Sequence, residues 1–105
     1  LKRFVKIGGE MISLPAIEAA LLPHFSKAGD EGPPLAVDAV VAGGSPEIVL
    51  YSIRSLERDQ VNAILREAGF SPLYYVRRVV EVPAIPVLGT GKTDYRALAG
   101  QSAEA

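Results

Sequence analysis

The spacing of hydrophobic residues changes several times along the chain, and each change predicts a new element. Short apolar runs at residues 4–7 and 11–12 flank Gly8 and Gly9, which predicts two strands joined by a two-residue turn. Such a turn is of type I′, in which both central residues take positive φ, and glycine does so without steric cost. Apolar residues then recur at helical spacing, which predicts a helix over residues 14–25 with Ser13 as its N-cap.

The middle of the chain has a different, β-rich pattern. Apolar, β-branched runs at residues 35–42 and 48–53 flank Gly-Gly-Ser-Pro, which predicts a hairpin buried on at least one face. A stripe of apolar positions follows and predicts a second helix, with Ser55 as its expected cap and Gly69 as the residue just past its end.

The last third of the chain predicts one more strand and one more helix. Residues 74–82 are rich in Val and Tyr and read as a strand, which Pro83 prevents from continuing. Beyond a loop, Asp94 is the expected cap of a short helix that runs through Leu98.

The order of these elements predicts an α+β fold. An N-terminal two-stranded hairpin is followed by a small, mainly antiparallel three-stranded sheet flanked by helices. We expect one domain over residues 1–99 and a flexible tail over residues 100–105.

Composition narrows the possible functions. The 105 residues include no cysteine, which rules out a disulfide framework, a thiolate zinc site and a thiol nucleophile. A formal net charge of -1 provides no basic field for nucleic acid, so we expect no nucleic-acid partner. No apolar run approaches the roughly 20 residues of a membrane helix, and we expect a soluble, cytoplasmic protein. Leu1 opens a patterned segment without an initiator Met, so we expect the chain to be part of a larger protein.

Two segments resemble known sites at first sight. Residues 89–93 read GTGKT and end like a phosphate-binding P-loop, but that motif needs a glycine where this chain has Pro86. What remains is Lys92 on a glycine-bearing loop, with its ammonium free to reach outward. His24 is the sole histidine and has no His or Cys with which to form a metal cluster, so we expect no metal site.

The two ends of the chain carry motifs that resemble one enzyme superfamily. Residues 2–18 read KRFVKIGGEMISLPAIE, and residues 86–98 read PVLGTGKTDYRAL. They resemble the opening and closing motifs of the C-terminal domain of AMP-forming, adenylate-forming acyl-CoA synthetases, luciferases and peptide-synthetase adenylation domains. The order and separation of the motifs fit that domain over practically the whole chain. Within the superfamily they look most like the acyl-acyl carrier protein synthetase half of the bifunctional lysophospholipid (2-acylglycerophosphoethanolamine) acyltransferase.

This resemblance implies roles for particular residues. Lys92 matches the lysine that contacts the substrate carboxylate and the α-phosphate of ATP during adenylation, on a loop supported by Gly89 and Gly91. Lys2 matches the hinge about which the domain rotates between half-reactions. The segment of Gly8, Gly9 and Glu10 matches the hairpin that lines the pantetheine tunnel during thiolation, although a tight turn alone also accounts for the glycines.

The resemblance also implies partners. The parent enzyme would use ATP with Mg, bound mainly by an N-terminal adenylation domain that this chain lacks, so we expect no bound cofactor and no turnover in this fragment. The substrate would be a fatty acid, and the acceptor an acyl carrier protein or CoA. Inner-membrane association of the parent and its fusion to an acyltransferase stay open. The alternative is a stand-alone, non-catalytic protein-interaction module with the same fold.

Overall fold

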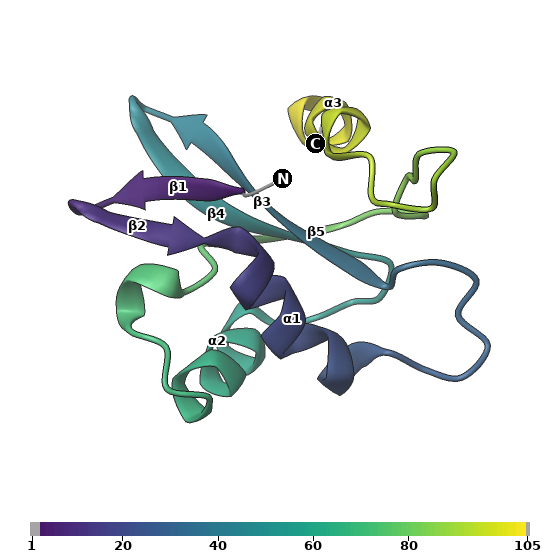
Figure 1. Ribbon diagram of the computed structural model, residues 1–105, viewed down its shortest axis with the longest axis horizontal. Coiled ribbons are helices and arrows are strands. Elements are labelled where there is room, and N and C mark those ends of the chain that lie inside the picture. The colour runs from purple at the N-terminus through teal and green to yellow at the C-terminus, as the bar shows by residue number, and fades with distance from the viewer. Residues whose placement is uncertain (1–2, 105) are drawn as a thin grey trace.

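A computed structural model describes residues 3–104 and shows the order of elements in an α+β fold (Figure 1). The elements are β1 (Phe4–Ile7), β2 (Glu10–Ser13), α1 (Leu14–Phe25), β3 (Leu35–Ala42), β4 (Ser45–Ser52), α2 (Arg58–Glu67), a single 3₁₀ turn (Pro72–Tyr74), β5 (Arg78–Glu81) and α3 (Tyr95–Glu104). The predicted fold class is confirmed. No helix within the described part of the chain has the length and apolar character needed to cross a membrane.

Both hairpins turn on paired glycines. β1 and β2 pair antiparallel with Ile7 opposite Glu10, and Gly8 and Gly9 take φ values of 58° and 81°. The β3–β4 hairpin turns in the same way, with φ values of 61° and 84° at Gly43 and Gly44. Positive φ at both central residues is the type I′ geometry predicted for the first hairpin, and it matches the right-handed twist of the strands.

The main sheet has the strand order β3-β4-β5 and is mixed. β3 pairs antiparallel with β4 along its full length, whereas β5 pairs parallel with β4 from Arg78 to Glu81. A parallel neighbour requires a crossover between the two strands, and α2 supplies it.

The sheet is buried on both faces, so the molecule has two apolar cores. Alternate residues of β3 and β4 point to opposite faces. On one face the sheet contributes residues that pack with α1 and α2, namely Leu35, Val37, Ile48 and Leu50. On the other it contributes residues that pack with Leu98 of α3, namely Ala36, Val49, Tyr51 and Val80. This two-sided burial explains the continuous apolar runs in the sequence.

Helix α1 has the predicted bounds. Ser13 caps it, since its Oγ accepts a hydrogen bond from the Ala16 amide at 3.2 Å, and Pro15 lies in the first turn. Ile17 and Leu21 are fully buried on the face that meets the sheet. The packing of that stripe supplies most of the stability of such a helix.

Three predicted boundaries were wrong. α2 begins at Arg58 with Glu57 at the N-cap position, and Ser55 lies outside it. The strand predicted over residues 74–82 is shorter, because Val76 is hydrogen-bonded to a side chain before β5 begins. Its amide donates to the Asn62 side chain at 2.7 Å, and its carbonyl accepts a hydrogen bond from the same side chain at 2.9 Å. α3 continues past Leu98 to Glu104, since its alanine-rich sequence outweighs the cost, about 1 kcal/mol, of Gly100 inside a helix.

The end of α2 follows the prediction. Gly69 takes a φ of 93°, and the amides of Gly69 and Phe70 donate to the carbonyls of Arg66 and Leu65. This is the Schellman arrangement that a glycine just past a helix end allows.

Candidate active-site loop

The loop that carries Lys92 is closed by its own backbone hydrogen bonds. Val87 and Thr93 form an antiparallel bridge, and the Leu88 amide donates to the Lys92 carbonyl at 2.7 Å. The Gly91 amide donates to the Leu88 carbonyl at 2.9 Å. The loop is therefore a narrow hairpin with a defined backbone path, and the Lys92 side chain is exposed on it.

The two glycines predicted to support this loop have different conformations. Gly91 takes a φ of 90°, in the left-handed region that side-chain-bearing residues rarely adopt. Gly89 is exposed on the loop and is not among the positive-φ residues of the described chain. Glycine is thus demanded by backbone geometry at Gly91, directly before Lys92.

Both ends of the loop are anchored in the core beneath α3. Ile85 on the upstream side and Leu98 on the downstream side are buried in the same cluster. Asp94 caps α3, as predicted, because its carboxylate accepts a hydrogen bond from the Ala97 amide at 3.1 Å. These anchors hold the two ends of the hairpin against the domain.

A hollow of about 840 Å³ lies beside the loop. Its lining brings together residues from both ends of the chain, among them Arg3, Glu18, Leu88, Lys92, Tyr95 and Arg96. Of the charged residues that line the hollow, Arg3, Lys92 and Arg96 are cationic, and Glu18 and Asp94 are acidic. The lining therefore has an excess of one positive charge, which favours an anionic group.

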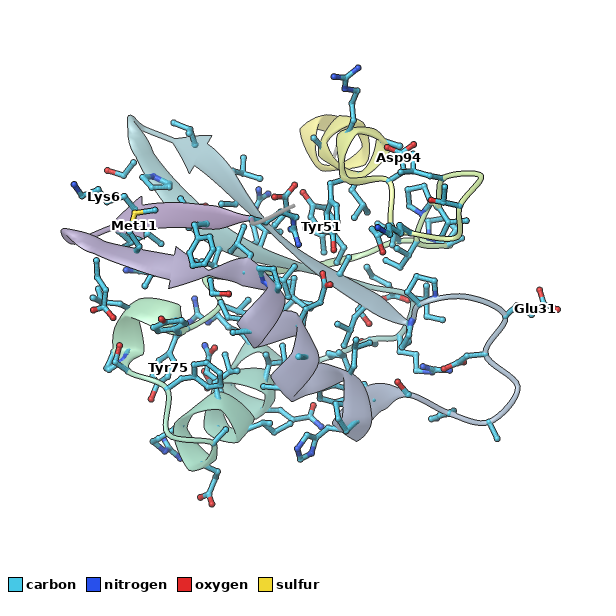
Figure 2. The ribbon with its side chains drawn as sticks, viewed as in Figure 1. Lys6, Met11, Glu31, Tyr51, Tyr75 and Asp94 are labelled. Carbon is cyan, nitrogen blue, oxygen red and sulfur yellow. The ribbon has the colours of Figure 1, made fainter. Side chains whose placement is uncertain are left out.

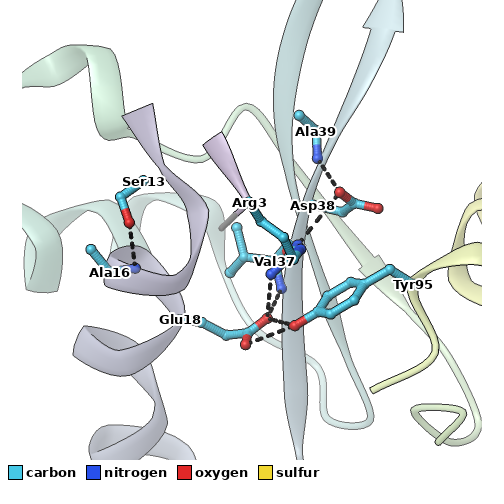
Figure 3. A network of polar contacts seen from close by, with 8 residues as sticks. All are labelled: Arg3, Ser13, Ala16, Glu18, Val37, Asp38, Ala39 and Tyr95. Atoms are coloured by element: carbon cyan, nitrogen blue, oxygen red, sulfur yellow. Dashed lines mark hydrogen bonds and ion pairs between the residues drawn. The ribbon is translucent and has the colours of Figure 1, made fainter. Parts of the chain in front are cut away.

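A polar network forms one wall of this hollow (Figure 3). The Tyr95 hydroxyl donates to the Glu18 carboxylate, with oxygen distances of 2.8 and 2.9 Å, and the Arg3 guanidinium stacks 3.4 Å from the centre of the Tyr95 ring. Glu18 also accepts a hydrogen bond from the Val37 amide at 2.7 Å. Arg3 donates to the Val37 carbonyl and lies 3.5 Å from a carboxylate oxygen of Asp38.

The network keeps the Tyr95 phenol protonated. Burial raises its pKa to about 12, the nearby Glu18 carboxylate adds to the rise, and the Arg3 charge and the Thr93 side chain oppose it. A phenol with that pKa is a hydrogen-bond donor throughout the physiological range. Tyr95 therefore serves this site as a fixed donor.

The predicted thiolation residues lie elsewhere. Gly8, Gly9 and Glu10 are exposed at the tip of the β1–β2 hairpin, at the opposite end of the domain from the Lys92 loop (Figure 1). An added Cβ at Gly8 would lie 3.3 Å from the Leu73 side chain, so this turn packs closely on the segment after α2. The predicted hinge residue Lys2 lies outside the described residues.

Three residues of the network had no predicted role, although each lies within a quoted motif. Arg3 directly follows Lys2, Tyr95 is three residues past Lys92, and Glu18 ends the opening motif. Their meeting could not be predicted, because 77 positions separate Glu18 from Tyr95. Within residues 3–104, no group of three His, Cys, Asp or Glu side chains is arranged to hold a metal ion.

Comparison with known proteins identifies the fold. No family model matches the chain. Among solved structures, apo MbtA from Mycobacterium smegmatis is 23% identical with a TM-score of 0.79, over 95% of this chain and 19% of that one. The amide bond synthetase McbA from Marinactinospora thermotolerans is 20% identical with a TM-score of 0.75, over 96% and 20% of the two chains. A Mycobacterium tuberculosis fatty acyl CoA synthetase is 18% identical with a TM-score of 0.72, over 93% and 19%.

These likenesses show a shared fold. This chain spans 19% to 20% of the length of the three matched chains, so its fold corresponds to a small part of each of them.

Proposed function

We propose that this chain is the mobile C-terminal domain of an ATP-dependent ligase that activates a fatty acid as its acyl adenylate and transfers the acyl group to a thiol. The observation that carries the proposal is the exposed Lys92 on a hydrogen-bonded hairpin. The fold of this chain also matches a small part of two solved synthetases. The motif resemblance at both ends of the chain supports the same assignment. ATP would bind together with Mg, mainly to the N-terminal domain of the parent.

In the first half-reaction, the Lys92 ammonium group would stabilise the negative charge that develops at the reacting centre. A carboxylate oxygen of the fatty acid attacks the α-phosphorus of ATP, a new P–O bond forms, and the bond to pyrophosphate breaks. Two anions approach one another in this step, which an ammonium group at the reacting centre would stabilise. The anchored ends of the hairpin limit the entropy lost when Lys92 is brought to that position.

In the second half-reaction, the opposite end of the domain would face the active site. A thiol sulfur attacks the carbonyl carbon of the acyl adenylate, a thioester forms, and AMP leaves. Gly8 and Gly9 would let the thiol-bearing arm pass close to the backbone. The separation of this turn from the Lys92 loop suits a domain that presents each end in turn (Figure 1).

The acceptor in this proposal is CoA or an acyl carrier protein, and the motifs favour the carrier protein. The need for ATP makes the cytoplasm the expected compartment. Rotation would occur about Lys2. The isolated 105-residue chain would be inactive, because the ATP and acyl sites belong to the rest of the parent.

The substitution Lys92→Ala in the full-length protein tests the proposal. We expect the adenylation barrier to rise by about 3 kcal/mol, the loss typical of one preorganised charge-stabilising donor. Pyrophosphate exchange with fatty acids of several chain lengths measures this step. Thioester formation from preformed acyl adenylate should be unaffected.

Lys27→Ala is the matched control, because Lys27 is another exposed lysine on a loop, outside both motifs. Its exchange rate should equal that of the wild type. An unchanged exchange rate in Lys92→Ala would refute the proposal.

A further inference from the structure

We propose that Tyr95 is a positioning residue for Lys92, held in place by Arg3 on one side and by Glu18 on the other. The inference rests on the proposed role of Lys92 in adenylation. It gives a role to the polar network of Arg3, Glu18 and Tyr95, which has no other role in the two proposed half-reactions.

Tyr95 is the link between the Lys92 loop and the body of the domain. It is the first residue of α3 and follows Lys92 by three positions. The intervening Thr93 both bridges to Val87 and interacts with the Tyr95 side chain. A displacement of the Tyr95 ring would therefore displace the strand of the hairpin that carries Lys92.

The partners of Tyr95 are fixed independently of it. The backbone of Val37 in β3 accepts a hydrogen bond from Arg3 and donates one to Glu18. Both side chains are largely buried, with 21% of Arg3 and 17% of Glu18 exposed. The ring thus has a cation over its face and a carboxylate at its hydroxyl.

The network of Arg3, Glu18 and Tyr95 also joins the proposed hinge region to the Lys92 loop. Arg3 directly follows the proposed hinge residue Lys2 and directly precedes β1. The network therefore links Arg3, beside the proposed hinge, to Tyr95 at the start of α3 (Figure 3). When the domain rotates, this connection would keep the ammonium group in a constant position relative to the axis of rotation.

The expected effect follows from the sensitivity of reactions to placement. A misplacement of a reacting group by about 1 Å costs roughly 100-fold in rate. Tyr95→Phe removes only the hydroxyl and leaves the ring, its stacking on Arg3 and the Leu98 anchor in place. We therefore expect about a tenfold loss in the adenylation rate. The loss should fall on adenylation alone.

The experiment is a double-mutant cycle in the full-length protein. Pyrophosphate exchange is measured for Tyr95→Phe in the wild-type background and in the Lys92→Ala background. We expect about a tenfold loss in the first and none in the second, because a residue that acts through Lys92 has no effect once Lys92 is gone. Thioester formation from preformed acyl adenylate should not change.

Two further variants provide a second test of the network and a control. Glu18→Gln keeps an oxygen acceptor but removes the charge that strengthens the hydrogen bond from the Tyr95 hydroxyl. It should therefore show a smaller loss with the same dependence on Lys92, even if Tyr95→Phe folds poorly. Tyr75→Phe is the matched control, since Tyr75 lies on the opposite side of the domain from Asp94, the neighbour of Tyr95 (Figure 2). It should behave as the wild type.

The outcomes separate this inference from the proposed function. If Lys92→Ala lowers exchange but Tyr95→Phe and Glu18→Gln do not, only the inference is overturned. Equal losses in both backgrounds, or equal losses in both half-reactions, also overturn it, because either would indicate a general structural role. If Lys92→Ala leaves exchange unchanged, the proposed function and this inference fall together.

Discussion

Replacing Tyr51 by phenylalanine should stabilise the domain, although Tyr51 is a large side chain of the core. Tyr51 is 0% exposed and packs in the cluster between the sheet and α3. Its hydroxyl is the one buried side-chain polar atom in the described chain that lacks a hydrogen-bond partner. A buried hydroxyl without a partner loses its hydration and gains nothing in return.

The size of the effect follows from two opposing contributions. Burial of an unpaired hydroxyl costs about 1–3 kcal/mol in protein mutational data. Removal of one oxygen leaves a void of about 15 Å³, which at about 24 cal/mol per Å³ costs about 0.4 kcal/mol. We therefore expect Tyr51→Phe to raise the free energy of unfolding by about 1 kcal/mol and the melting temperature by about 4 °C.

Urea unfolding of the chain measures this change, which should appear as a higher midpoint with an unchanged slope. Tyr95→Phe is the matched comparison, since it removes the same atom where the hydroxyl donates to Glu18. That variant should lose about 1 kcal/mol, the typical net value of one hydrogen bond. A loss of stability in Tyr51→Phe comparable to that in Tyr95→Phe would refute the reasoning, because it would show that the Tyr51 hydroxyl has a partner.

Two further predictions concern other parts of the fold. Gly8→Ala should destabilise the chain more than Gly43→Ala. The two glycines have similar φ values, 58° and 61°, but only at Gly8 would the added Cβ lie 3.3 Å from the Leu73 side chain. Urea midpoints of the two variants measure the difference, and equal midpoints would contradict the prediction. The hydrogen bond from Arg54 lowers the pKa of Asp30 from its ordinary value of 3.8. The stability that Asp30 contributes is therefore fully present above that ordinary value and is lost as the pH falls through the lowered pKa. Asp30→Asn should therefore be less stable at neutral pH and lose less stability on acidification, and parallel pH profiles for variant and wild type would contradict this.

Much of the fold could be predicted because it depends on local rules. The paired glycines predicted the turn at Gly8 and Gly9, Ser13 and Pro15 predicted the start of α1, and Gly69 predicted the end of α2. Each of these features involves residues within about one helical turn of one another, so the chain needs no distant contact to specify them.

One of the three wrong boundaries depends on a contact between distant residues. The start of β5 depends on the Asn62 side chain, which bonds to the backbone of Val76 from another element. The parallel pairing of β5 with β4 was likewise not predicted, because a strand of four residues contains no signal for the direction of its neighbour.

For the candidate site, the sequence by itself determined which residues can do chemistry: a lysine on a glycine-bearing loop, and a pair of glycines in a turn. Only the tertiary structure decided their geometry. It set Lys92 and the Gly8–Gly9 turn at opposite ends of the domain, and it brought Arg3, Glu18 and Tyr95 into one network. Turn chemistry is encoded in neighbouring residues, whereas the meeting of side chains from both ends of the chain depends on how the helices pack on the two faces of the sheet.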